Sequence, residues 1–389
     1  MDTLHSFEPR YDAVIVGARC AGAATALLLA RSGAKVLVVD RQTYGSDTLS
    51  THALMRGAVL QLQRWGLVPE ILAAQTPPIR TTTFHYGSDA IRVLIKPEHE
   101  VECLFAPRRT VLDRILVDAA RNAGAEVRHG VLLSELQFAS DGRVIGVALK
   151  GAGGSRMTVR ADIVIGADGR QSTVAQLVNA RAYVEGVNAS GIVFGYFENL
   201  IQDGSHWHFT RNAAAGVIPT NSSHCVFAAA PSAKFLPTFR GDVMRGFLQV
   251  LEAICPELRA GAERGTLIGR LRGFGGAPGY LRQCHGAGWA LVGDAGYFKD
   301  PLTAHGITDA LRDAELLSRA IVHGGARALG TYQRDRDALS LPLLRITDAI
   351  ASFSRDLDEV KQLHTQLSAA MKMETDHLAG LSQVSPLAA

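Results

Sequence analysis

The sequence has few cysteines, and none has the spacing of metal ligands. Its five cysteines are scattered over 389 residues, and no two of them form a Cys-x-x-Cys pair. A disulfide framework needs paired cysteines and a zinc site needs closely spaced ligands, so we expect neither. The low count is typical of a reducing compartment, and we expect a cytoplasmic protein without a bound metal.

An excess of one charge and long apolar runs are also lacking. Forty basic side chains face 37 acidic ones, a net charge of +3, which is too small for a surface that binds nucleic acid. The longest apolar stretch, residues 21–30, is far shorter than the roughly 20 residues that cross a bilayer. Asp2 and Glu8 are unlike the basic start of a signal peptide. We therefore expect no nucleic-acid partner, no leader and no stable membrane insertion.

The chain does contain enough apolar surface for a large globular core. Hydrophobic residues make up 47% of it and charged residues 20%, which excludes a disordered or fibrous protein. At about 100–200 residues per domain, this length predicts two or three structural units.

The first forty residues have the pattern of a dinucleotide-binding unit. An apolar strand at 12–16 leads into a turn from Gly17 to Gly22, an Ala- and Leu-rich helix, and a second apolar strand that ends in Asp40. In such a unit the backbone N–H groups of the turn and the helix N-terminus face a pyrophosphate. Asp40 is placed to accept hydrogen bonds from an adenosine ribose.

The turn departs from the usual fingerprint at its centre. Arg19 stands where a further glycine is usual, although its guanidinium could itself contact phosphate. A strand–helix turn without a ligand is the alternative. We predict cofactor contacts by these residues of the turn and of the strand end: Gly17, Ala18, Arg19, Cys20, Ala21, Gly22, Asp40 and Arg41.

Two more glycine–aspartate motifs follow short apolar strands. Residues 166–169 read Gly-Ala-Asp-Gly, and Gly293-Asp294 precedes a long predicted helix. With these motifs in this order after the first turn, the chain resembles the para-hydroxybenzoate-hydroxylase-like family of FAD-dependent monooxygenases over nearly its whole length. Geranylgeranyl-reductase relatives share that fold.

The resemblance implies an α/β fold in three parts. We expect a discontinuous, Rossmann-like FAD-binding domain, a sheet-rich substrate domain and a helical C-terminal tail with a kink or a break at Pro342. The predicted boundaries are 1–75, 101–182 and 285–330 for the FAD-binding domain, 76–100 and 183–284 for the substrate domain, and 331–389 for the helical segment.

The resemblance also assigns cofactor contacts in the later motifs. In the family the Asp-Gly motif lies near the pyrophosphate and the Gly-Asp motif places a carboxylate on the ribitol hydroxyls. Ala175 stands where the family commonly has an arginine, which leaves the handling of NAD(P)H open. Carried over by position, the cofactor contacts fall on Asp168, Gly169, Gly293 and Asp294, with family arginines matched by Arg109 and Arg56.

The loop before the long helix is expected to face the flavin ring. A helix N-terminus carries about half a positive charge, which suits the pyrimidine edge of an anionic reduced isoalloxazine. We expect Pro301, Gly306 and Ile307 at the cofactor. His305 is the one histidine that we single out as a proton donor or substrate contact, with an ordinary loop histidine as the alternative.

The segment from about 183 to 231 has strand alternation and many aromatic residues. Alternation places His206 and His208 on the face opposite Trp207, and we exclude a metal pair there because no third ligand lies nearby in the sequence. Packing of the domain core is the alternative to a substrate pocket. The candidates for lining an aromatic substrate pocket are Phe194, Tyr196, Trp207, Phe209 and Arg211.

These motifs lead to one functional hypothesis and three alternatives. We expect a monooxygenase in which NAD(P)H reduces FAD and a flavin hydroperoxide hydroxylates or epoxidises a small, aromatic or polycyclic molecule. A reductase of carbon–carbon double bonds and a non-enzymatic prenyl-protein escort module are the alternatives. A halogenase is disfavoured because no Trp-x-Trp-x-Ile-Pro stretch occurs. A homodimer or a separate flavin reductase would be the protein partner.

Overall fold

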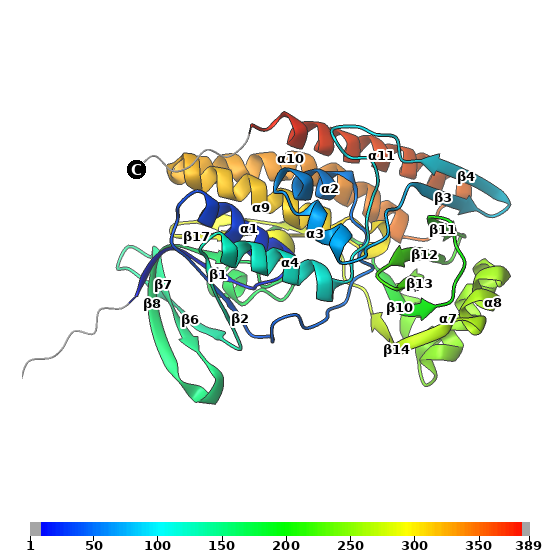
Figure 1. Cartoon of the computed structure of the whole chain (residues 1–389), viewed down its shortest axis with the longest axis horizontal. Helices are drawn as coiled ribbons and strands as arrows, with labels where there is room; N and C mark the ends of the chain where they lie inside the picture. The colour runs from blue at the N-terminus through cyan, green and yellow to red at the C-terminus, as the bar shows by residue number, and fades with distance from the viewer. Residues whose placement is uncertain (1–8, 383–389) are drawn as a thin grey trace, which may run out of the picture.

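The structure is a computed structural model that describes residues 9–382. The expectation drawn from Asp2 and Glu8, and the outer ends of the predicted ranges 1–75 and 331–389, lie outside the described residues. Two sheet units lie side by side, and long helices near the end of the chain run along both of them (Figure 1). No helix in the described part of the chain is long and apolar enough to cross a membrane.

The first sheet contains the predicted strand–helix–strand unit. Its main path runs β16-β17-β8-β1-β2-β5, and β1 pairs in parallel with both β2 and β8. The residues of β2 are all buried and mostly β-branched, as expected for a central parallel strand. The strands of this sheet are β1 (Arg10–Val16), β2 (Val36–Asp40), β5 (Glu126–His129), β6 (Leu132–Phe138), β7 (Val144–Lys150), β8 (Arg156–Gly166), β16 (His285–Gly286) and β17 (Trp289–Leu291).

Helices cover this sheet and connect it to the rest of the chain. Helix α1 packs against both α4 and α9, and α2 packs against α9. The apolar residues between these helices and the strands form the largest buried cluster of the described chain. The helices of this unit are α1 (Cys20–Arg31), α2 (Arg56–Arg64), α3 (Val68–Ala73), α4 (Arg109–Asn122), α5 (Thr173–Leu177) and α9 (Gly306–His323).

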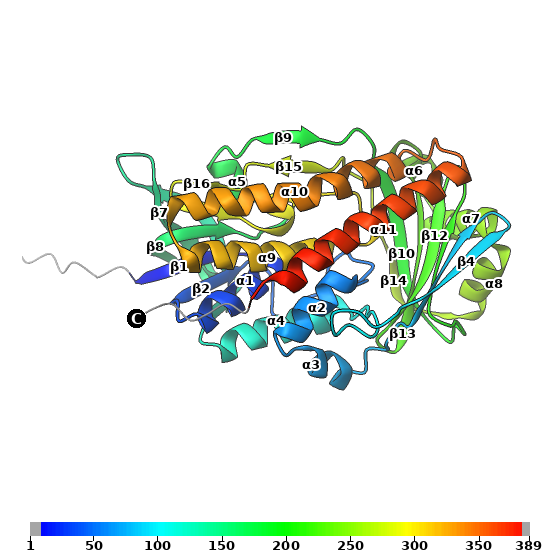
Figure 2. The same cartoon turned by 90° about the horizontal axis from the view of Figure 1, so that it is seen from above.

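The second sheet has seven strands in the order β14-β10-β13-β12-β11-β3-β4. Its described pairings are antiparallel except that of β3 with β11, which is parallel. Helices α6, α7 and α8 cover its outer face (Figure 2). The elements are β3 (Thr81–Tyr86), β4 (Asp89–Leu94), β10 (Ser190–Glu198), β11 (Ser205–Phe209), β12 (Ala214–Thr220), β13 (Ser223–Pro231), β14 (Thr266–Phe274), α6 (Ser232–Phe239), α7 (Val243–Ile254) and α8 (Pro256–Arg264).

A small sheet of β9 (Ala182–Glu185), β15 (Tyr280–Arg282) and β18 (Tyr297–Phe298) joins the two larger units. It brings together chain segments that leave and re-enter the second sheet. Short 3-10 turns at Ala152–Gly154, Gly293–Ala295 and Pro301–Thr303 complete the assignment. The chain is thus an α/β protein with a sheet-rich second unit and a helical C-terminal part, as predicted.

The C-terminal helices α10 (Gly325–Ala351) and α11 (Leu357–Gly380) correct one of the two alternatives expected at Pro342. Pro342 lies inside α10 and does not break it, because proline removes only one backbone hydrogen bond and the adjacent Leu343 and Leu344 are fully packed. The break comes at residues 352–356, where Phe353 has φ +51°. A capping box of Asp356 and Glu359 then starts α11.

Two local predictions also needed correction. The apolar pattern of residues 127–133 predicts one strand, but the chain forms two, β5 and β6, because Gly130 turns it at φ +71°. Arg211 does not continue the alternation of β11, because the strand ends at Phe209 and Arg211 is exposed in the turn that follows.

Candidate functional site

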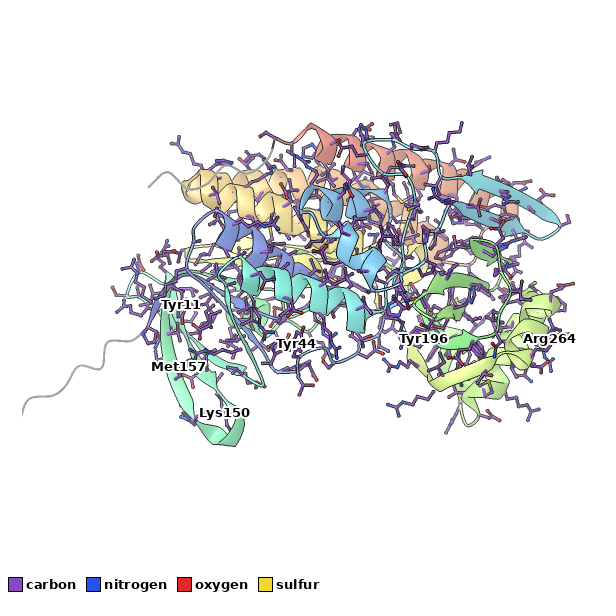
Figure 3. All side chains as sticks on the ribbon, viewed as in Figure 1. Tyr11, Tyr44, Lys150, Met157, Tyr196 and Arg264 are labelled. Carbon is purple, nitrogen blue, oxygen red and sulfur yellow. The ribbon has the colours of Figure 1, made fainter. Side chains whose placement is uncertain are left out.

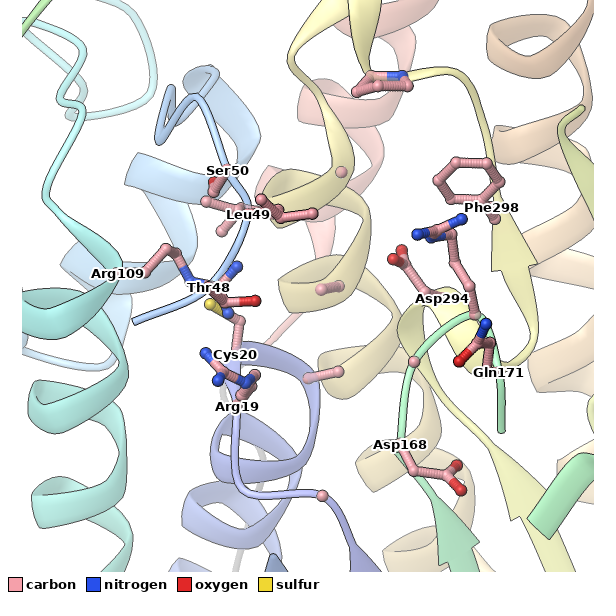
Figure 4. A pocket seen from close by; sticks show the side chains of 18 of the residues that line it. Arg19, Cys20, Thr48, Leu49, Ser50, Arg109, Asp168, Gln171, Asp294 and Phe298 are labelled. Carbon is pink, nitrogen blue, oxygen red and sulfur yellow. The ribbon is translucent and has the colours of Figure 1, made fainter. Parts of the chain in front are cut away.

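A cavity of about 1080 Å³ lies between the two sheet units. It opens where the carboxyl ends of β1, β2 and β8 meet the starts of helices, which is the usual ligand position in an open parallel sheet. Figure 4 shows Arg19, Cys20 and Arg109 on one side of it and Asp294, Gln171 and Phe298 on the other. The predicted residues that line it are Gly17, Arg19, Cys20, Ala21, Asp40, Arg41, Arg109, Asp168, Gly169, Phe194, Asp294, Pro301, Gly306 and Ile307.

The glycine turn is packed so closely that only glycine fits at its two ends. Gly17 has φ +109°, and a Cβ there would lie 2.4 Å from the carbonyl oxygen of Ala167. A Cβ at Gly22 would lie 1.8 Å from the carbonyl oxygen of Gly17. The backbone N–H of Ala18 donates to Asp40 Oδ2 at 2.7 Å, so the acid at the end of β2 holds the turn in place. Asp40 also lines the cavity, whereas Ala18 and Gly22 support its wall from behind.

Arg19 has partners within the protein at the position of the missing glycine. Its guanidinium donates to Asp113 at 3.1 Å and to the carbonyl of Asp47 at 3.3 Å. It therefore ties the loop after β2 to helix α4 while it forms part of the cavity wall. A phosphate at this wall would have to share a guanidinium that is already paired.

The Asp168 carboxylate accepts hydrogen bonds within the turn after β8 and does not point into the cavity. One carboxylate oxygen accepts from the backbone N–H of Thr173 at 2.6 Å, and the other accepts from the Ser172 hydroxyl. In Figure 4 the Asp168 carboxylate points away from Arg19 and Cys20. Gly169, at φ +80°, has open space where a Cβ would stand. The Asp-Gly motif therefore lines the cavity mainly with backbone atoms.

Asp294 is the acid left without a partner at this site. In the part of the chain that the structure describes, its carboxylate accepts no hydrogen bond, although it lines the cavity. Burial raises the pKa of Asp294 to about 6, against a smaller opposing effect of Arg170. Gly293 lets this segment approach α1, because a Cβ there would lie 2.8 Å from that of Ala21. A ligand that donates hydrogen bonds would satisfy this carboxylate.

The two predicted arginines have different positions. Arg109 lies at the start of α4, lines the cavity and is held by Asp113, with contacts of 3.0 and 3.1 Å. Arg56 does not line the cavity. It donates instead to the carbonyls of Lys96 at 2.8 Å and Val101 at 3.0 Å, and so secures the segment before α4.

The start of α9 forms another wall. A Cβ at Gly306 would meet open space, and Ile307 lines the cavity beside it. His305 is 1% exposed and lies behind this wall, with Nδ1 3.1 Å from Asp309 and Nε2 2.9 Å from Glu374. Burial lowers the pKa of His305, but the Glu374 and Asp309 carboxylates outweigh burial and raise it overall. Lys299 contacts Asp309, and both of these line the cavity.

The second sheet contributes fewer of its predicted residues. Phe194 lines the cavity, but Trp207 and Phe209 are buried in the apolar cluster between the inner face of the sheet and the C-terminal helices. Arg211 is exposed elsewhere. Tyr196 faces the first unit (Figure 3) but lies behind the wall. Ile192, from the same row of strand residues as Phe194, also lines the cavity. Residues that the sequence analysis missed complete this side: Arg270, Leu271, Arg272 and Phe274.

His52 is the most informative residue missed by the sequence analysis. It lines the cavity at φ +67°, is 1% exposed, and its Nε2 contacts the hydroxyl of Tyr196. Its Nδ1 is buried and has no hydrogen-bond partner among the described residues. Burial, followed by the charges of Arg109 and Arg108, lowers the pKa of His52 well below 6.5. The only sequence signal was a polar loop after the second strand.

Another missed residue overturns an argument about metals. His85 on β3 lies beside His206 and His208, and one ring nitrogen from each histidine lies within 4.8 Å of the others. The reasoning that no third ligand lies near His206 and His208 was therefore wrong, because the third comes from a distant segment.

The residues present fit an FAD. The glycine turn brings backbone N–H groups and a helix N-terminus to one end of the cavity, Asp40 lies where a ribose is expected, and the unpartnered Asp294 carboxylate lies near the start of α9. The cavity volume of about 1080 Å³ is at the upper end of the roughly 300–1,000 Å³ of small-molecule pockets, as a dinucleotide requires.

Comparison with known proteins agrees with this geometry. The family described as FAD binding domain matches residues 10–346. A menaquinone reductase of Mycolicibacterium smegmatis is 27% identical over 90% of this chain and 89% of its own length. A 6-methylpretetramide 4-monooxygenase of Streptomyces rimosus is 27% identical over 85% of this chain and 79% of its own length.

The solved structure of the flavin-dependent brominase Bmp2 has a similar fold. It superposes with a TM-score of 0.81 at 17% identity, over 96% of this chain and 94% of that one. At this identity the likeness concerns the fold alone.

Proposed function

This chain belongs to the FAD binding domain family, as an FAD-dependent oxidoreductase, and we propose that it is a monooxygenase. In the proposed reaction NAD(P)H and O2 are consumed, one oxygen atom enters an aromatic or polycyclic substrate, and the other leaves as water. With one proton also taken up, the products balance as hydroxylated substrate, NAD(P)+ and H2O.

The first sheet unit supplies the proposed FAD contacts. Backbone groups of the Gly17 turn and of Gly169 would face the pyrophosphate, Asp40 the adenosine ribose and Asp294 the ribitol hydroxyls. The start of α9 would face the pyrimidine edge of the ring, where its N–H groups favour negative charge. When bound, FAD supplies two-electron redox chemistry and O2 activation.

The observation that carries the proposal is the composition of the cavity wall on the second sheet. Phe194 stands opposite Arg272 in the pairing of β10 with β14, and Ile192 and Arg270 line the same wall. Apolar side chains thus share this wall with guanidinium groups, of which that of Arg272 pairs with Asp47 at 2.9 Å. Such a wall suits a flat, apolar molecule with an anionic or phenolic oxygen, because the ring packs and the oxygen pairs. A long prenyl chain would instead require a continuous apolar wall.

His52 and Tyr196 are the proposed polar contacts on the substrate side. The neutral imidazole of His52 has one donor and one acceptor nitrogen. Because Nε2 contacts the Tyr196 hydroxyl, Nδ1 is the nitrogen left for a substrate. The Arg108 guanidinium lies 3.4 Å above the Tyr196 ring and holds it in place. We assign His52 the contact with a substrate hydroxyl and Tyr196 the positioning of His52.

A reductase is the second candidate, because the menaquinone reductase of M. smegmatis covers nearly the whole chain. The decisive experiment compares O2 uptake with NAD(P)H oxidation by the purified flavoprotein, with phenolic and polycyclic compounds as substrates and menaquinone as the competitor. The proposal expects substrate-dependent O2 uptake and a product heavier by one oxygen. Two results together would contradict the monooxygenase proposal: reduction of menaquinone under anaerobic conditions, and no O2 uptake with any substrate under aerobic conditions.

The partner and the location remain parts of the proposal. We expect a cytoplasmic enzyme that acts on a small-molecule substrate. NAD(P)H would reduce its flavin, either directly or through a separate flavin reductase. A homodimer is the proposed assembly, and sedimentation of the purified chain tests it.

A further inference from the structure

A cluster of three histidines lies on the second sheet, away from the cavity. His206 and His208 are two residues apart on β11, so they share one face of the sheet. His85 stands opposite His208 in the parallel pairing of β3 with β11. The buried Trp207 and Phe209 occupy the other face, so the three imidazoles belong to the outer face.

The three rings are close enough to share one ion. The ring centroids of His85 and His208 are 4.1 Å apart, and those of His85 and His206 are 5.4 Å apart. One ring nitrogen from each residue lies within 4.8 Å of the other two. Zinc–nitrogen bonds of about 2.0 Å in tetrahedral geometry place nitrogens roughly 3.3 Å apart. Because the His85 and His208 rings stack with an interplanar angle of 2°, these half-buried rings would have to rotate about χ2 to bring their lone pairs onto one ion.

The hydrogen bonds already select the nitrogens that a metal needs. His206 Nε2 lies 3.0 Å from the carbonyl oxygen of Asp203, to which it can only donate. His206 Nδ1 then carries the lone pair and faces His85 Nε2 at 3.1 Å. A backbone carbonyl that fixes the tautomer of a ligating histidine is a recurring support of metal sites. A metal ion would replace the proton that these two nitrogens share.

The charge state of the cluster also suits a metal. Burial, with the neighbouring histidines, lowers the pKa of His208 to about 4 and lowers that of His85, which is the direction that favours the uncharged imidazole. Glu257 on α8 is the one carboxylate that acts on His208. The other two groups of potential ligands in the described chain differ, because Lys372 pairs with one and Lys299 and Arg312 pair with the other.

From this geometry we propose that His85, His206 and His208 bind one divalent transition-metal ion of the zinc class. Three neutral imidazoles favour Zn²⁺, Ni²⁺, Co²⁺ or Cu²⁺ over Mg²⁺ or Ca²⁺, and a fourth position stays open for water. The ion would fasten β3 to β11, the parallel junction between two segments that are distant in the chain. This site is separate from the FAD cavity and does not depend on the monooxygenase proposal.

The test uses the full-length flavoprotein prepared without a polyhistidine tag and stripped with EDTA. Equilibrium dialysis against Zn²⁺ alone, followed by metal analysis, should show one more bound zinc ion per chain (one equivalent) in the parent than in His85→Gln or His208→Gln. In these two variants the dissociation constant for this ion should rise about a hundredfold. Zn²⁺ should raise the melting temperature of the parent but not that of the two variants. His224→Gln and His99→Gln are the matched controls and should keep the ion.

Bound FAD reports whether each variant is folded, because the cavity lies on the other face of the sheet. Equal zinc content in the parent, His85→Gln and His208→Gln would overturn the proposal, and so would loss of the equivalent in His99→Gln instead. If a glutamine variant loses its FAD, His206→Asn provides the second test, since its ring only faces the cluster and Asp203. Retention of zinc by His206→Asn would likewise contradict the site.

Discussion

His305 Nε2 lies 2.9 Å from a carboxylate oxygen of Glu374, which joins the loop at the cavity to the C-terminal helix. Glu374 also pairs with Arg312 at 2.7 Å, and all three side chains are almost fully buried. The helix α11 that carries Glu374 also reaches the second sheet, where Tyr86 and His364 share a hydrogen bond of 2.8 Å. One helix therefore fastens both sheet units around the cavity (Figure 2).

Replacing Glu374 by Gln should destabilise the protein by about 3 kcal/mol, because two buried cations each lose one of their anions. Urea unfolding followed by circular dichroism would measure the change. Asp376→Asn is the matched control on the same helix, since Asp376 pairs with Lys372 at the surface and should cost about 0.5 kcal/mol or less. An equal loss in both variants would contradict the role of the buried pair.

The contribution of His305 should depend on pH. Its pKa is raised in the folded protein, so the protonated ring stabilises the fold fully below the unfolded value of about 6.5, and this stabilisation is lost as the pH rises through the folded pKa. The free energy of unfolding lost in His305→Gln should thus be larger at pH 6 than at pH 9. A loss that grows with pH would contradict this sign.

Asp294→Asn should separate stability from cofactor affinity. The folded pKa of about 6 lies above the ordinary 3.8, so ionisation opposes folding once the pH exceeds about 4, and by neutral pH this costs the FAD-free protein about 1–3 kcal/mol. The variant should therefore melt at a higher temperature without FAD and bind FAD at least tenfold more weakly. Unchanged FAD affinity by fluorescence titration would remove Asp294 from the cofactor site.

Gly22→Ala should prevent a normal glycine turn. Because the new Cβ would lie 1.8 Å from the Gly17 carbonyl oxygen, we expect loss of FAD and destabilisation by more than about 2 kcal/mol. Gly261→Ala on α8 is the control, since its nearest neighbour would be at 3.5 Å, and it should stabilise by up to about 1 kcal/mol. Yellow protein of parental stability from Gly22→Ala would refute this account.

Arg109→Ala and Arg56→Ala should have different effects. Only Arg109 lines the cavity, so its removal should weaken FAD binding at least tenfold, while Arg56→Ala should mainly expose residues 96–101 to proteolysis. Limited proteolysis and FAD titration on both proteins would show this. Equal losses of FAD affinity would indicate that Arg56 acts on the cofactor after all.

His52→Asn should uncouple cofactor binding from turnover. Asparagine tolerates the positive φ of this position, so FAD content should stay unchanged while product formation falls about a hundredfold, with a smaller fall in Tyr196→Phe. The lowered pKa of His52 also means that the parental rate should not change with its protonation between pH 6 and 9. Full activity of His52→Asn would exclude it from the substrate contact.

The sequence predicted those parts of the protein in which local pattern decides structure. The apolar strands, the glycine turn and Asp40 follow from residues close together in the chain, and the structure places them on one wall. Arg19 and Asp168 show a limit of this reasoning, because their partners Asp113 and Thr173 are set by packing and backbone geometry. Motif position indicates where such a residue lies, but not which way its side chain points.

Contacts between distant segments could not be predicted in this way. His52 and Tyr196 are 144 positions apart, and His85 and His206 are 121 apart. No periodicity links such pairs, since they depend on which strands become neighbours. The break offered as one alternative at Pro342 is absent for a related reason, because the packing of Leu343 and Leu344 maintains a helix that the local proline rule would end.

The position of α11 has a consequence for the order of assembly during synthesis. Arg312 and His305 emerge from the ribosome before Glu374, so in a nascent chain these two cations have only the anions of their own helix, Asp309 and Asp313. The remaining carboxylate of this buried network arrives with α11, so its charges are fully compensated only once that helix has emerged and packed.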